Sequence, residues 1–375
     1  MRPRLSLYIL TIACLIPGGC TKKFRLPADE QTPPPRWTYS RQDVRSTARI
    51  GSDFGGELNL KWEDKISESP VSPLSIGAGR LIFCGTKRRI YFYDIKSGDF
   101  KGRVNTKGNV QTGVVVIDSV AYFGTSPKTD EFFCLNLHNR KVLWSRPLKD
   151  VTGGPIIIDD RLFVGSSAGE LYCLNRLSGE IIWQRSAKAK SLAGPSGGGG
   201  IVYFPLDNGN LMALKAATGE MVFEAKLDQP LAAKTVLGDN VYVTGIEGGL
   251  FAVDRQSGET AWSKEFAYPV WTSPALDDGV LFFGDNGGLV RALNTDDGSV
   301  LWEFQSEGVV VSSPIIVGDF VIFGSLDRFL YCCDKKTGTL VSSREFKRGI
   351  SIAPVSDGQV ICVASQDGTI QCFGD

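Results

Sequence analysis

The chain has 375 residues, which is too long for one ordinary domain outside the all-β and repeat architectures. Hydrophobic residues make up 42% of it, which is ample for a large core. Lysine plus arginine and aspartate plus glutamate both number 41, and no basic stripe is present, which argues against nucleic acid as a partner. A single histidine, His138, restricts histidine chemistry, and 43 glycines favour a protein with many tight turns.

The first twenty residues are typical of an export signal. Two arginines precede an apolar run over 5–16, which is too short to span a bilayer and is followed by Pro-Gly-Gly and Cys20. Small residues before a cysteine resemble a bacterial lipoprotein signal, in which the cysteine is acylated and becomes the N-terminus. We therefore expect a signal peptide over 1–19 and a lipid anchor at Cys20. The alternative is an ordinary cleaved signal with an incidental cysteine.

The segment over 20–40 is polar and rich in proline, which is typical of a semi-extended tether. Such a tether would hold a domain away from the membrane in which its anchor lies. No acidic residue directly follows Cys20, which favours an outer membrane lipoprotein that faces the periplasm of a bacterial envelope. The folded domain is expected over 41–375.

This domain is built from a repeat of about 40 residues, for which a sequence should be searched first. One repeated position ends an apolar run and recurs every 39 to 41 residues: Gly85, Gly124, Gly165, Pro205, Gly245, Gly284, Gly324 and Ala364. A second position lies in a turn, at Gly98, Arg140, Gly179, Gly219, Gly258, Gly298 and Gly338. Four residues after it stand Gly102, Trp144, Trp183, Phe223, Trp262, Trp302 and Ser342.

Each repeat consists of short apolar runs separated by turn sequences such as Asp-Asp-Gly and Asp-Asn-Gly-Gly. Four strands of about five to seven residues and three tight turns account for one repeat. No sustained period of 3.6 residues follows residue 40, so helix is nearly absent. Eight four-stranded units predict an all-β fold, an eight-bladed β-propeller.

The final repeat lacks its fourth strand, because the chain ends at Asp375 after the third. A matching strand over 58–62 precedes the first repeat, so we expect the N-terminal segment to complete the eighth blade. That pairing would remove a free sheet edge. The alternative is a seven-bladed ring with a stray half-unit.

The strings Tyr-Cys-Leu-Asn over 172–175 and Phe-Ala-Val-Asp over 251–254, each followed by a glycine and a tryptophan, resemble the bacterial PQQ-like propeller repeat. The resemblance covers about residues 57–375. It implies one of two functions. One branch of this family is the lipoprotein scaffold of the outer-membrane β-barrel assembly machinery. The other comprises quinoprotein dehydrogenases, enzymes that bind pyrroloquinoline quinone and calcium in the central channel.

The residues favour the non-catalytic branch. The dehydrogenases stack their quinone on a vicinal disulfide, but Cys332 of the Cys332-Cys333 pair aligns with Cys173 and with alanines, which indicates core packing. No Cys-x-x-Cys motif occurs, His138 lies in a turn, and the Asp-Gly turns lack the spaced ligands of calcium loops. We expect no catalytic residue, cofactor, metal site or disulfide framework.

A partner surface is expected where each first strand begins, near the mouth of the channel. At the position two before the Ser-Pro element, four consecutive repeats carry apolar residues: Leu192, Leu231, Trp271 and Val311. Such an arc is a docking candidate, although burial between blades is the alternative. The predicted function is a membrane-anchored scaffold for envelope proteins, including the assembly machinery. A quinoprotein dehydrogenase and a propeller that binds sugars or peptides are the alternatives.

Overall fold

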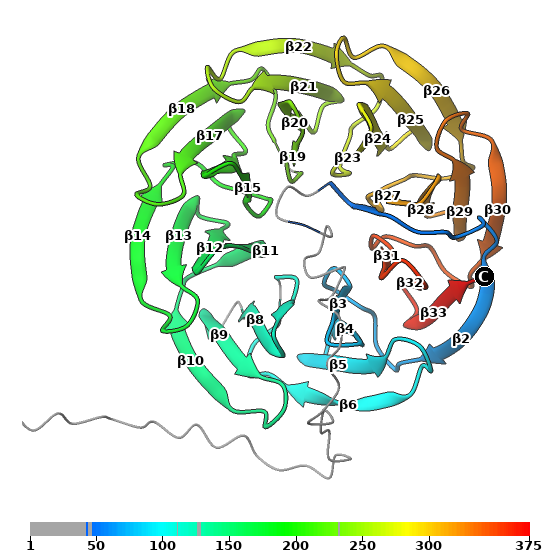
Figure 1. Ribbon diagram of the computed structural model, residues 1–375, viewed down its shortest axis with the longest axis horizontal. Coiled ribbons are helices and arrows are strands. Elements are labelled where there is room, and N and C mark those ends of the chain that lie inside the picture. The colour runs from blue at the N-terminus through cyan, green and yellow to red at the C-terminus, as the bar shows by residue number, and fades with distance from the viewer. Residues whose placement is uncertain (1–42, 44–46, 111, 126–128, 232) are drawn as a thin grey trace, which may run out of the picture.

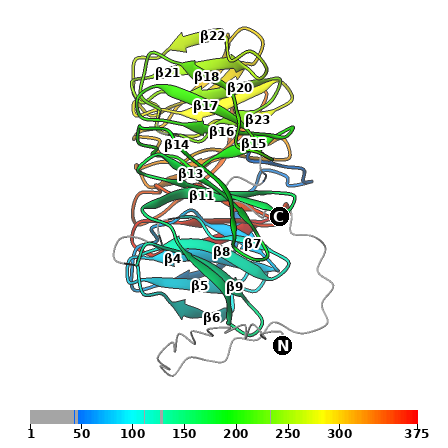
Figure 2. The ribbon, with the colours of Figure 1, turned by 90° about the vertical axis from the view of Figure 1, so that its left-hand side faces the viewer.

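The computed structural model describes residues 43, 47–110, 112–125, 129–231 and 233–375. These residues form a ring of eight blades, each a four-stranded antiparallel sheet, and one blade carries an additional parallel strand (Figure 1). The described residues contain no α-helix. Seen from the side, the ring is flat and narrow (Figure 2). The predicted eight-bladed β-propeller is confirmed.

The first four blades follow one another along the chain. Blade 1 contains β3 (Ser75–Gly77), β4 (Arg80–Gly85), β5 (Arg89–Asp94) and β6 (Phe100–Asn105), and blade 2 contains β7 (Val115–Ile117), β8 (Val120–Thr125), β9 (Glu131–Asn136) and β10 (Val142–Pro147). Blade 3 contains β11 (Val151–Ile158), β12 (Arg161–Ser166), β13 (Glu170–Asn175) and β14 (Ile181–Ser186). Blade 4 contains β15 (Ser196–Gly198), β16 (Ile201–Pro205), β17 (Asn210–Lys215) and β18 (Met221–Lys226).

The remaining blades include the two that involve the N-terminal segment. Blade 5 contains β19 (Val236–Leu237), β20 (Asn240–Thr244), β21 (Gly249–Asp254) and β22 (Thr260–Glu265), and blade 6 contains β23 (Ala275–Asp277), β24 (Val280–Gly284), β25 (Leu289–Asn294) and β26 (Val300–Gln305). Blade 7 contains β27 (Ile315–Val317), β28 (Phe320–Gly324), β29 (Phe329–Asp334) and β30 (Leu340–Glu345), with β1 (Arg49–Ile50) at its inner edge. Blade 8 contains β31 (Val355–Ser356), β32 (Ile361–Ala364), β33 (Thr369–Gly374) and β2 (Asn59–Lys65).

The ring has two unlike faces, because the strands of every blade alternate in direction from the channel outward. One side carries the turns between the second and third strands and the loops that lead from one blade to the next; we term it the loop face. The other side carries the turns between the first and second and between the third and fourth strands; we term it the turn face.

Neighbouring blades are joined by a tryptophan of the fourth strand. The indole nitrogen of Trp183 donates to the carbonyl of Ala216 in blade 4 at 3.1 Å, and its ring covers Gly219. A β-carbon at Gly219 would lie 2.7 Å from the ring, and its φ of +68° also favours glycine. The same bond is made by Trp62, Trp144, Trp262 and Trp302 to the next blade.

Two blades have no aromatic residue at the tryptophan position. Blade 1 has Gly102 in place of the tryptophan, and the turn it would cover in blade 2 has Arg140, at φ 59°, in place of glycine. With no ring above the turn, a side chain fits there. In blade 7 Ser342 replaces the tryptophan, and its hydroxyl donates to the carbonyl of Gly56 at 2.6 Å, in the N-terminal segment.

The predicted closure of the ring is confirmed. Strand β2 is the outer strand of blade 8 and pairs antiparallel with β33. The guanidinium of Arg344 in blade 7 donates to the carbonyl of Leu58 at 2.6 Å, which joins this strand to the preceding blade. The two ends of the ring therefore meet within one sheet.

The expectation of cysteines without a disulfide is wrong for one pair. Cys362 and Cys372 lie opposite each other on β32 and β33, with Cα atoms 4.2 Å apart, and form a disulfide. In blade 3 the equivalent pair joins a large residue, Phe163, to a small one, Cys173. Cys372 occupies the position of Cys173, and Cys362 occupies that of Phe163.

The sequence did not predict strand β1. It pairs parallel with β27 and so lies on the channel side of blade 7, where Ala48 and Ile50 are buried. From there the chain crosses blade 7 and reaches the outer strand β2 (Figure 1). A bond from the amide of Leu276 to the carbonyl of Thr47, 3.0 Å, also ties this segment to blade 6.

We predict that Gly219→Ala lowers the free energy of unfolding by about 3 kcal/mol, since the new methyl group meets the Trp183 ring and the positive φ is strained. Gly200→Ala is the matched control: its φ is +77°, but no atom lies within 4 Å of the new methyl group, so we expect a loss of about 1 kcal/mol. Denaturant unfolding measures both. Equal losses would contradict a tryptophan that requires glycine beneath it.

Candidate functional site

The entrance to the channel on the loop face is shaped by two consecutive residues ahead of each first strand. The first of the two is buried, as are Val270 and Val310. The second lies at the surface: Trp271 is 49% exposed, Leu192 49% and Val71 46%. The surface residues form the set we term the mouth, with Thr152, Val311 and Ser351 as its partly buried members.

Two of the four predicted docking residues are half-exposed at the mouth, namely Leu192 and Trp271, and Val311 is partly buried. Leu231 is fully buried, so its assignment to an exposed arc is wrong. It bridges to Gly245 as Pro70 bridges to Gly85, which places it in the first, buried column. Blade 5 has no Ser-Pro element, and the alignment therefore slipped by one residue there.

The mouth is held in place by hydroxyl groups that directly follow its residues. Thr272 accepts a hydrogen bond from the amide of Gly284 at 3.0 Å and donates to the carbonyl of the same residue at 2.7 Å. Ser72 and Ser312 accept the equivalent bonds from Cys84 and Gly324. Because these groups are buried, the bonds fix the backbone that carries Trp271, Val71 and Val311.

Beneath the mouth, side chains bond one inner strand to the next. The hydroxyl of Ser313 accepts from the amide of Ser273 at 2.9 Å, and the hydroxyl of Ser273 accepts from the amide of Lys234 at 3.1 Å. The ammonium of Lys234 donates to the carbonyl of Gly154, two blades away, at 2.9 Å. Lys234 is buried, and its side chain passes Gly194, which has no β-carbon to obstruct it.

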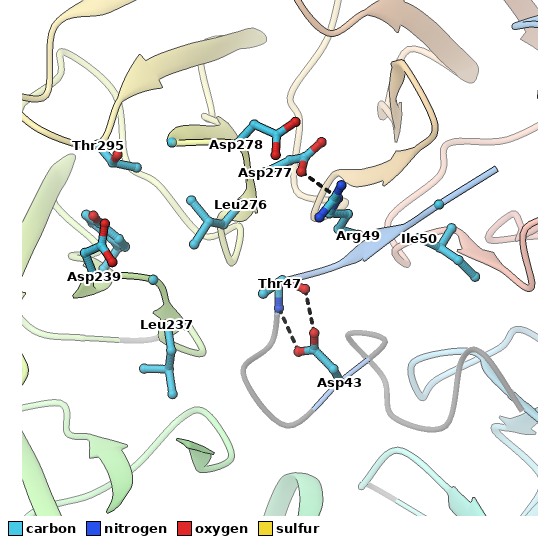
Figure 3. A pocket seen from close by; sticks show the side chains of 14 residues that line it. Asp43, Thr47, Arg49, Ile50, Leu237, Asp239, Leu276, Asp277, Asp278 and Thr295 are labelled. Atoms are coloured by element: carbon cyan, nitrogen blue, oxygen red, sulfur yellow. Dashed lines mark hydrogen bonds and ion pairs between the residues drawn. The ribbon is translucent and has the colours of Figure 1, made fainter. Parts of the chain in front are cut away.

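On the turn face, a cavity of about 800 Å³ lies between the N-terminal segment and blades 5 and 6 (Figure 3). Its most buried carboxylate is Asp277, which forms ion pairs with Arg49 of β1 at 2.5 Å and with Lys335 of blade 7 at 2.9 Å. Burial opposes the charge of Lys335, but the hydrogen bond and charge of Asp277 outweigh it and raise the pKa of Lys335. This carboxylate therefore holds β1 in the channel.

The adjacent cysteines do not fit a quinone site. Cys332 and Cys333 are free, fully buried and located in β29, which β1, β27 and β28 separate from the channel. Successive residues of a strand point to opposite faces of the sheet, so the pair offers no common surface to a planar ring. Within the described residues, no group of three or more His, Cys, Asp or Glu side chains could hold a metal ion. His138 is exposed in the turn between β9 and β10.

The predicted signal peptide (1–19), the tether (20–40) and Cys20 lie outside the described residues. In the part of the chain that is described, no helix is long and apolar enough to cross a membrane.

The sequence matches the profile of a family described as outer membrane protein assembly factor BamB, over residues 58–185 and 174–373. BamB from Moraxella catarrhalis is 18% identical, with a TM-score of 0.74 over 85% of this chain and 100% of that one. A europium-containing methanol dehydrogenase is 13% identical, with a TM-score of 0.76 over 88% of this chain and 89% of that one. No curated protein sequence matches significantly.

A quinohemoprotein alcohol dehydrogenase from Comamonas testosteroni also shares the architecture. It is 12% identical, with a TM-score of 0.76 over 91% of this chain and 80% of that one. At such identities these structures show a common fold alone.

We predict that the free cysteines of the folded protein resist alkylation at pH 8. Burial raises the pKa of Cys84, Cys173, Cys332 and Cys333 to about 12, which leaves about one thiolate in ten thousand. Peptide mapping after iodoacetamide treatment assigns the labels by residue, and treatment in 6 M guanidinium is the control, in which all should react. Native labelling of Cys332 and Cys333 would show that they are accessible.

Proposed function

Because the chain belongs to the family of outer membrane protein assembly factor BamB, we propose that it is a non-catalytic, membrane-anchored propeller scaffold. Its partners are other envelope proteins, among them components of the β-barrel assembly machinery. The observation that carries the proposal is the mouth, where Trp271, Leu192 and Val71 are half-exposed. Buried hydroxyl groups next to them, those of Thr272, Ser191 and Ser72, are bonded to the backbone. Exposed aromatic and aliphatic side chains on a rigid support are typical of protein interfaces.

The anchor in this proposal is the acylated Cys20 of an outer membrane lipoprotein that faces the periplasm. The described part of the N-terminal segment joins the ring on the turn face. Residues 50–52 cross the turn face, where the carbonyl of Ile50 accepts from the amide of Gly318 and the hydroxyl of Ser52 donates to the carbonyl of Gly358.

A quinoprotein dehydrogenase is the enzymatic alternative, and its fold is shared. The position of Cys332 and Cys333 inside blade 7 argues against it, because neither side chain reaches the channel. Lys234 and strand β1 also lie on the channel side of the blades.

We predict that Trp271→Ser combined with Leu192→Ser lowers the recovery of assembly components at least tenfold in affinity capture from detergent-solubilised membranes. Truncating two half-exposed apolar residues at an interface removes about 2 kcal/mol or more of binding free energy. Leu301→Ser with Val142→Ser is the control, because these residues are 53% and 42% exposed on outer strands, away from the mouth. If the Trp271/Leu192 variant recovers as much of the assembly components as the wild type and has the same melting temperature, the mouth is not the docking site.

Adding pyrroloquinoline quinone and calcium to the purified protein tests the enzymatic alternative directly. We expect no dye-linked oxidation of primary alcohols and no cofactor retained after gel filtration. A known quinoprotein dehydrogenase reconstituted in parallel is the positive control. Turnover above the protein-free rate would overturn the non-catalytic assignment.

A further inference from the structure

The loop face carries a row of cations across blades 8 and 1. The row runs through five consecutive segments, 346–350, 365–369, 65–69, 86–89 and 105–109. Backbone hydrogen bonds join each segment to the next: Gln366 to Gly349, Ile66 to Gly368, Thr86 to Ser69, and Thr106 to Arg88, all between 2.9 and 3.1 Å. We term the cations of these segments the basic arc: Lys347, Arg348, Lys65, Lys87, Arg88, Arg89 and Lys107.

Most of this charge is not neutralised within the arc. The same five segments contain seven cations and two carboxylates, a surplus of five positive charges. Asp367 pairs with Lys65 at 2.8 Å, and the buried carboxylate of Glu68 pairs with Arg89 at 3.3 Å. Burial opposes ionisation of Asp367, but hydrogen bonds, led by that from Lys65, outweigh it and hold its pKa far below the usual range.

One member of the arc is kept at a conformational cost. Arg88 has φ 59°, a left-handed conformation that non-glycine residues rarely adopt. At the corresponding turn position, five other blades have glycine: Gly169, Gly209, Gly248, Gly288 and Gly368. The carbonyl of Arg88 accepts from the amide of Thr106, and its guanidinium donates to the carbonyl of Lys107 at 3.2 Å. Asp130 and Arg328 take the same left-handed conformation at this position in blades 2 and 7, so it is the bond to Lys107 that holds the Arg88 guanidinium at the surface of the arc.

The opposite part of the loop face lacks this surplus, because the carboxylates of its turns and loops are accompanied by Lys188, Lys190 and Arg328. Its turns and loops, in blades 4 to 7, carry Asp207, Asp228, Glu247 and Glu307. The balanced charge of the whole chain thus conceals a local surplus of positive charge on the loop face, and such a surplus orients an anionic partner before contact.

We propose that the basic arc binds an acidic polypeptide segment of a partner protein, whose adjoining apolar residues contact the mouth. The inference rests on the scaffold function proposed above. Val71 belongs to the mouth and lies two residues after the arc segment 65–69, so one extended chain can supply carboxylates to the arc and an apolar side chain to Val71. A partner that supplies both groups favours a polypeptide over membrane headgroups, which supply charge alone.

The test is a titration of the full-length protein in detergent with a fluorescent poly-L-glutamate of about 20 residues, followed by anisotropy at low salt. The arc variant is Lys87→Glu/Arg88→Glu/Arg348→Glu. The control is Lys96→Glu/Lys141→Glu/Lys336→Glu, which makes the same change in charge with exposed residues of the turn face. We expect the arc variant to bind at least tenfold more weakly and the control to stay within twofold of the wild type.

No binding by the wild type, or an equal loss in both variants, would overturn the proposal. A second arm compares sedimentation of the three proteins with vesicles of phosphatidylcholine and vesicles that also contain 30% phosphatidylglycerol. Binding to the anionic vesicles that depends on the arc and exceeds poly-L-glutamate binding would assign the arc to headgroups and also overturn it. Neither arm contains an assembly component, so the outcome is independent of the affinity capture that tests the scaffold function.

Discussion

The structure depends on one contact between neighbouring blades: an indole ring that lies on a turn without a side chain and donates to a carbonyl of that turn. This contact combines apolar burial, a buried hydrogen bond and a backbone conformation suited to glycine, as at Trp183 and Gly219. A blade sheet has little to bury against except its neighbours, so the contact determines how blades stack. Where the ring is missing, at Gly102, the glycine requirement disappears as well.

Most of the fold could be predicted because the same sequence pattern is repeated in each blade. Glycines, aromatic residues and apolar runs recur with each blade, so a degenerate member such as Ser342 does not hide the pattern. Features that occur once have no such support. Strand β1 is held by the Arg49–Asp277 ion pair and by the pairing of its two residues with β27. It is not part of the repeat, so the repeat pattern does not predict it. The Cys362–Cys372 bond forms where blade 8 has a small residue at both positions of a pair that joins a large and a small residue in blade 3.

The location of the candidate site could be predicted from the sequence, but not every residue that lines it. The mouth was expected ahead of the first strands, and Trp271 and Leu192 lie there. Leu231 does not, because alternation in a strand makes a slip of one residue exchange a surface position for a buried one. The glycine and serine positions that place Lys234 across the inner strands carry no motif. Only the packed ring brings together residues 80 positions apart.

The closure of the ring also sets an order of events in folding. Strand β2 is made early, but its partner β33 lies about 300 residues later, as the 314-residue separation of Lys61 from Asp375 shows. Contacts of such range slow folding, and until they form the chain keeps an unpaired edge at each end. A chain that ends before residue 369 lacks β33, so the edges of β2 and β32 stay open and can pair with the edges of other chains. Once β33 has formed, it pairs with both strands and closes these edges.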